Sequence, residues 1–162
     1  MPLARSRHLF VLAFMLAMFA LSAVVYLENA VALQPCPLRF VQHGFLLAIA
    51  ALNGLAWWHR PGSRGNRAYC IGALLLICLG AASAIRQLWL QVNPQQLYPS
   101  CPPNLLLLGK SEALLQTVKV LVLGTPDCAI INWTLLDMSL PEWSLLTFAG
   151  LAVITAIQLF QR

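Results

Sequence analysis

The residues Leu9–Leu27, LFVLAFMLAMFALSAVVYL, contain no charged side chain. A stretch of this length predicts an α-helix that crosses a lipid bilayer, because about 20 apolar residues span a hydrocarbon core roughly 30 Å thick. Three similar stretches follow at residues 40–58, 68–85 and 143–160. Of the 162 residues, 60% are hydrophobic and only 9% are charged, whereas about a quarter are charged in soluble domains. The sequence therefore predicts an all-α integral membrane four-helix bundle that forms a single domain over residues 1–162.

The first stretch has an alternative interpretation as a cleaved signal peptide. Arg5 and Arg7 precede it, and Ala30-Val31-Ala32 looks like a cleavage site. The apolar region of a signal peptide usually has about 7–15 residues, and this stretch is longer and is followed by further spanning stretches. We therefore expect a retained helix.

The basic residues predict how the bundle is oriented. With both chain ends on one side, that side holds six arginines: Arg5, Arg7, Arg60, Arg64, Arg67 and Arg162. Loops rich in lysine and arginine stay in the cytoplasm, so we expect both termini to be cytoplasmic. Two loops, at about residues 28–39 and 86–142, then face outward, and all five acidic residues lie on that side.

The second outer loop contains an apolar segment that is too short to cross the bilayer. Its apolar side chains share one helical face opposite Glu112, Gln116 and Lys119, and they are Leu114, Leu115, Val118, Leu121 and Val122. Gly124 then ends the pattern. We expect a short amphipathic helix that lies on the membrane surface. The alternative is a helix packed against the ends of the bundle.

Several other functions find no support in the sequence. A net charge of +5 is compatible with nucleic-acid binding, but no basic cluster is interleaved with aromatic residues. The three histidines (His8, His43 and His59) are scattered, which argues against a metal site.

Two of the five cysteines lie in the second outer loop, in the turn-forming contexts PSCPPN (Cys101) and TPDCAI (Cys128). In an oxidising compartment two such thiols are expected to pair. The disulfide could be a staple for a loop with little core, or it could be opened by an incoming thiolate, and the local sequence supports both equally. Cys70 and Cys78 lie within the third spanning stretch, where we expect them to pack as small hydrophobic residues.

Cys36 lies in the stretch QPCPLRFVQHG, at the start of the second spanning helix. Pro37 suits the first helical position, which places Cys36 near the helix N-cap. The helix dipole there and the cation of Arg39 one turn further on both favour a thiolate. Cys36 is therefore a candidate nucleophile. The alternative is a remnant cysteine in a rigid turn.

These features together resemble the DsbB disulfide-bond formation proteins. The matching segments are PCPL in the first outer loop, PSC and later DCA in the second, and the approach to the last helix, Trp133-Thr-Leu-Leu-Asp-Met-Ser-Leu-Pro-Glu-Trp-Ser144. The resemblance implies a multi-pass protein of the bacterial inner (cytoplasmic) membrane with periplasmic redox loops. It implies that a DsbA-like periplasmic thiol oxidase passes electrons to the Cys101–Cys128 disulfide. A second cysteine pair at the head of helix two would pass them to a membrane quinone of the ubiquinone type.

Two positions depart from the family pattern. The family has Cys-X-X-Cys here, with an arginine four residues after the second cysteine. This chain has Arg39 in place of that second cysteine and His43 in place of that arginine. The resemblance places both residues in the vicinity of the quinone. Cys36 cannot form a disulfide within this motif, although it can attack Cys101 or Cys128.

Three hypotheses follow. The first is a quinone-dependent protein disulfide oxidoreductase with Cys36, Cys101 and Cys128 as catalytic residues. The second is a degenerate, non-catalytic member that binds or regulates a DsbA-like partner, because the quinone-side pair is incomplete. The third is a structural or transport bundle in which Cys101–Cys128 is only a staple, and the near-absence of ionisable residues in mid-helix gives transport little support.

Overall fold

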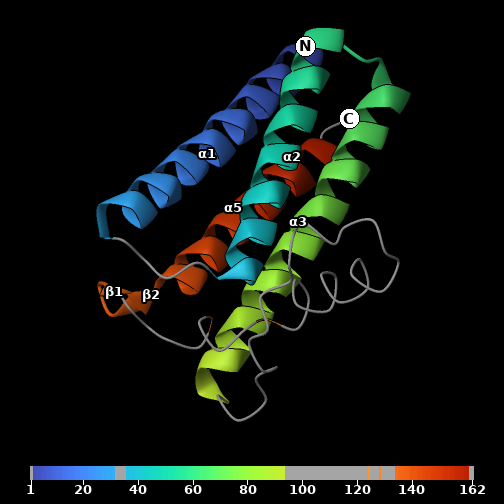
Figure 1. Cartoon of the computed structure of the whole chain (residues 1–162). Helices are drawn as coiled ribbons and strands as arrows, with labels where there is room; N and C mark the ends of the chain where they lie inside the picture. The colour runs from blue at the N-terminus through green and yellow to red at the C-terminus, as the bar shows by residue number, and fades with distance from the viewer. Residues whose placement is uncertain (1, 32–35, 94–123, 125–127, 129–133, 161–162) are drawn as a thin grey trace, which may run out of the picture.

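A computed structural model describes residues 2–31, 36–93, 124, 128 and 134–160. Its four helices are α1 (Pro2–Val31), α2 (Pro37–His59), α3 (Ser63–Val92) and α5 (Leu140–Phe160), and they run alongside one another as a bundle (Figure 1). A short antiparallel hairpin of β1 (Thr134–Leu135) and β2 (Met138–Ser139) leads directly into α5. All four helices are long and apolar enough to cross a membrane. The expected all-α membrane bundle is confirmed.

Each predicted spanning stretch lies inside one helix, but two helices continue well beyond the predicted ends. Glu28 lies in the last turn of α1 and Arg86 lies within α3, although both were expected in loops. The physical reason is that an apolar stretch marks the bilayer thickness, whereas a helix keeps satisfying its backbone hydrogen bonds when it continues into water. The amphipathic helix expected around residues 112–123 lies outside the described residues.

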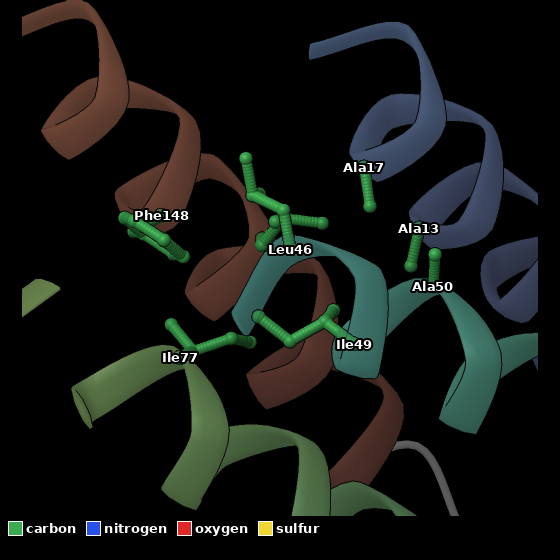
Figure 2. Close-up of a cluster of buried hydrophobic side chains, with 8 residues drawn as sticks. Ala13, Ala17, Leu46, Ile49, Ala50, Ile77 and Phe148 are labelled. Carbon is green, nitrogen blue, oxygen red and sulfur yellow. The ribbon is translucent and has the colours of Figure 1, made fainter. Parts of the chain in front are cut away.

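The centre of the bundle is packed with small residues from α1 against larger ones from the other helices. Ala13 and Ala17 of α1 face α2, whose inward side chains include Leu46, Ile49 and Ala50 (Figure 2). Ile77 of α3 together with Phe148 and Leu151 of α5 completes this cluster. In a bilayer, small residues let helix backbones approach closely and so gain dispersion contacts. The alanines of α1 therefore bring α2 close at this level.

The hairpin fixes where α5 begins. Leu136 and Asp137 have positive φ angles of 55° and 60°, as a two-residue type I′ turn requires. Glu142 then accepts hydrogen bonds from the backbone N–H and the hydroxyl of Ser139. The bond from the backbone N–H of Ser139 to the Glu142 carboxylate is the glutamate half of a capping box, so the sequence Ser-Leu-Pro-Glu starts α5.

Gly80 of α3 packs directly against Phe148 of α5. A Cβ atom at this position would overlap the ring of Phe148, which is fully buried. We expect Gly80→Ala to lower the free energy of unfolding by about 1–3 kcal/mol, because the added methyl group forces the buried ring of Phe148 to shift. Denaturation in detergent measures the change. Gly44→Ala in α2 is the matched control, since a Cβ there meets nothing within 4 Å, and equal stability of the two variants would contradict the prediction.

Candidate redox site

A disulfide joins Cys36 to Cys128 at one end of the bundle. The two Cα atoms are 5.1 Å apart, although the residues are separated by 92 positions in the sequence. Cys36 is the N-cap residue of α2, and Pro37 begins the helix as expected. Both cysteines are about 1% exposed and pack with Leu38 of α2 and Leu90 of α3. The disulfide is therefore enclosed by side chains of two helices.

Gly124 lets the chain that carries Cys128 come this close to the bundle. Its φ angle is +83°, which strongly favours glycine. A Cβ atom here would lie 2.7 Å from Cδ1 of Leu90 and 2.9 Å from Cδ1 of Leu38. Gly124 thus contacts the same two leucines that cover the disulfide. From its sequence context, Gly124 was expected only to end a helix.

The pairing corrects one expectation. Cys128 was expected to bond to Cys101, and this is wrong for the state that the structure describes, because Cys128 bonds to Cys36. Local sequence showed only that both loop cysteines have turn-forming neighbours, and it could not show that Cys128 lies at the head of α2. Cys101 itself lies outside the described residues.

Glu28, Arg39 and His43 form a charged group beside the disulfide. An Nη atom of Arg39 donates a hydrogen bond to Oε1 of Glu28 at 3.4 Å, and Nε2 of His43 lies 3.7 Å from the same oxygen. The three side chains are only 25%, 13% and 15% exposed, respectively. Arg39 and His43 share one face of α2 because they are four residues apart, and the last turn of α1 carries Glu28 to that face.

Two nitrogen atoms in this group have no hydrogen-bond partner, and only the one on Arg39 is a donor in every protonation state. Nε of Arg39 and Nε2 of His43 are both buried without an acceptor within hydrogen-bond distance. Buried donors are normally paired, so an unpaired one calls for an explanation. The Nε–H of Arg39, and one helical turn away an imidazole nitrogen that donates in one of its two tautomers, suit a ligand that carries acceptor oxygens. Arg39 and His43 were identifiable from the sequence, but Glu28 was not recognised there as their shared partner.

A buried amide pair supports the site from the side of α3. Nε2 of Gln42 donates to Oε1 of Gln87 at 2.8 Å, and both residues are about 1–2% exposed. The bond links the second turn of α2 to α3. Gln87 was not identified from the sequence. The only signal was an uncharged polar residue just beyond the predicted end of its helix.

The two remaining described cysteines are free thiols on α3. Cys70 is buried, and its Sγ lies 3.9 Å from Oε1 of Gln158. Cys78 is exposed and faces away from the bundle, whereas we expected both to pack as small apolar side chains. Within the part of the chain that the structure describes, no group of His, Cys, Asp or Glu could hold a metal ion.

A helical membrane bundle with a buried disulfide between a helix N-cap and a distant loop defines a membrane protein with a thiol–disulfide site. Residues 6–158 match the family model for disulfide bond formation protein DsbB. Over all 162 residues the chain is 39% identical to disulfide bond formation protein B of Stutzerimonas stutzeri, covering 100% of this chain and 99% of the relative. It is 38% identical to disulfide bond formation protein B 1 of Pseudomonas aeruginosa, with the same coverage.

A more distant relative covers the chain almost as fully. Disulfide bond formation protein B of Methylococcus capsulatus is 35% identical over 158 residues, which are 98% of this chain and 96% of the relative. No solved structure matches the chain. The chain belongs to the DsbB family, and it is an integral inner-membrane protein of disulfide-bond formation.

Proposed function

We propose that the protein is a disulfide oxidoreductase that reoxidises a DsbA-like dithiol protein and delivers the electrons to a membrane quinone. In this proposal the Cys36–Cys128 pair takes the role that the family motif gives to Cys-X-X-Cys. The observation that carries it is the buried Cys36–Cys128 disulfide beside Arg39 and His43. We further propose that this end of the bundle is periplasmic, since Arg60, Arg64 and Arg67 lie near the other end.

The two departures from the family motif compensate for each other in this arrangement. Arg39 removes one sulfur from the head of α2, and Cys128 supplies a sulfur to Cys36 instead. His43 removes the family's arginine, and Arg39 presents a guanidinium one turn earlier on the same helical face. The site therefore keeps two sulfur atoms and one permanent cation, as in the family motif. The second sulfur now comes from Cys128, and the cation comes from Arg39.

The side chains present fit a quinone. Its carbonyl oxygens accept hydrogen bonds, and the unpaired Nε of Arg39 is a buried donor. Nε2 of His43, on the same helical face, is a second donor in the tautomer that carries its proton there. The Arg39 cation favours negative charge at such an oxygen, and Glu28 offsets that cation when no ligand is present. A bound quinone would accept the two electrons and two protons released when the thiols of Cys36 and Cys128 re-form their disulfide.

In this proposal Cys36, Cys101 and Cys128 take up the two electrons of the partner dithiol by disulfide exchange. The thiolate of Cys101 attacks Sγ of Cys128, which breaks the Cys36–Cys128 bond and leaves Cys36 as a thiolate. One partner thiolate then attacks Sγ of Cys101, releasing Cys128, and the second partner thiolate resolves the mixed disulfide. The partner leaves oxidised, and Cys36, Cys101 and Cys128 remain as three thiols.

The second candidate function is that of a non-catalytic family member that holds or regulates a DsbA-like protein. Arg39 favours it, because the family motif has a cysteine there. In that case Cys101 or Cys128 would exchange with the partner once, and no electrons would leave the three thiols.

Turnover distinguishes these functions. The purified protein is mixed with an excess of reduced DsbA-like protein and with short-chain ubiquinone, whose absorbance reports its reduction. We expect many turnovers, with one quinone reduced for each partner disulfide formed. Oxidation of a single partner equivalent without quinone consumption would overturn the oxidoreductase in favour of the binding function.

A further inference from the structure

An apolar groove of about 300 Å³ lies between α1 and α2, away from the disulfide. Val11, Phe14 and Met15 of α1 line one side, and Gly54, Trp57 and Trp58 of α2 line the other. This is the end of the bundle where α1 begins and α2 ends (Figure 1). The lining is almost wholly apolar, so the groove suits a hydrocarbon chain better than a polar ligand.

The absence of a side chain at Gly54 contributes to this hollow. A Cβ atom there would be in ordinary contact with the ring of Phe14, at 3.4 Å. A small side chain therefore fits at position 54, and a long one would extend into the groove. The lining positions of α1 repeat at the spacing of one helical face.

Arg7 continues the α1 side of the groove by one turn beyond Val11. Its guanidinium carbon lies 6.0 Å from the centre of the Trp57 ring, and its Nε is buried without a hydrogen-bond partner. Among the described residues, ion pairs are found only at Glu28, near the other end of α1. Arg7 thus places a cation with an unpaired hydrogen-bond donor where the apolar groove reaches the end of the bundle.

We propose that the groove binds one acyl chain of an anionic phospholipid, and that Arg7 binds its headgroup phosphate. An arginine donates well to phosphate oxygens, and tryptophan rings favour the headgroup level of a bilayer, as Trp57 and Trp58 would do here. A phospholipid would fill the apolar groove with its acyl chain and accept a hydrogen bond from Nε of Arg7 with its phosphate. An isoprenoid tail would fill the walls and leave Arg7 without an acceptor.

Native mass spectrometry of the full chain, released from detergent with added lipid, tests this site. We expect phosphatidylglycerol to be retained about fivefold more than phosphatidylcholine, since a basic residue near a membrane contributes about 1 kcal/mol toward an anionic lipid. Arg7→Gln should remove this preference. Arg64→Gln is the matched control, because Arg64 is an exposed arginine at the same end of the bundle and outside the groove.

Two variants that fill the groove test the acyl chain separately. Gly54→Leu and Met15→Trp should each lower retention of both lipids, and each variant must keep the Cys36–Cys128 disulfide and elute as a single species. Equal retention of the two lipids by the unmodified protein would overturn the proposal. If the filling variants lowered retention but Arg7→Gln changed nothing, the groove would hold an apolar chain without a headgroup, which also overturns it.

Discussion

Replacement of Cys128 by serine is expected to abolish quinone reduction by a reduced DsbA-like protein. In the proposed relay Cys128 supplies the second sulfur to Cys36, and no other cysteine on the described part of the chain is bonded there. Without Cys128, the thiol of Cys36 has no second thiol with which to re-form a disulfide. The rate of quinone reduction should therefore fall on the order of 10³-fold or more, to the uncatalysed background. Absorbance of short-chain ubiquinone measures the rate.

The controls separate chemistry from folding. Closing a loop of 92 residues stabilises a protein by about 4–5 kcal/mol in the chain-entropy model, so loss of the disulfide also lowers stability. The variant must therefore elute as a folded, single species before its rate is compared. Cys78→Ser makes the same exchange at an exposed free thiol and should keep full activity.

Comparing the two single cysteine variants with the double variant tests whether Cys36 and Cys128 act together. Cys36→Ser should be as inactive as Cys128→Ser, and the double variant should be no worse, because the two sulfurs act as one unit. Quinone turnover that persisted in Cys128→Ser would show that the Cys36–Cys128 bond is a staple, and a different electron acceptor for Cys36 would then be needed.

The architecture was predictable because a bilayer imposes one simple requirement. Uncharged stretches such as Leu9–Leu27 must be helical, since each backbone polar group in the hydrocarbon region needs a partner within its own segment. The same reasoning could not locate the helix ends. Glu28 looked like a loop residue because it is charged, but a charged residue in a last helical turn beyond the hydrocarbon region costs little, and α1 continues through Val31.

The site was predictable only where neighbours in sequence are neighbours in space. Cys36, Arg39 and His43 are spaced by one turn each, so their common location followed from the helix alone. The Cys36–Cys128 bond and the Gln42–Gln87 bond join residues 92 and 45 positions apart. No local pattern encodes such distances, and the turn contexts of the two loop cysteines favoured the pairing that the structure does not contain.

Arg39→Gln is expected to separate the two halves of the proposed reaction. It removes the cation and the unpaired Nε beside His43, and a hydrogen bond to a charged group contributes about 1.5–3 kcal/mol. We therefore expect kcat/KM for short-chain ubiquinone to fall about 10- to 100-fold, since 1.4 kcal/mol corresponds to a factor of ten. The rate of single-turnover exchange between the Cys36–Cys128 disulfide and a reduced DsbA-like protein, measured by thiol trapping, should be nearly unchanged.

Arg86→Gln is the matched control, because it removes an arginine on α3 toward the same end of the bundle. The guanidinium carbon of Arg86 lies 4.8 Å from the centre of the Trp89 ring. This variant should leave both rates unchanged. Arg39→Lys keeps the charge but loses the planar set of donors, so it should recover part of the quinone rate if charge matters and little if the Nε donor dominates. If Arg39→Gln slowed the exchange step and the quinone step equally, Arg39 would act on the cysteines through the helix head. The idea that it replaces the family's arginine would then be wrong.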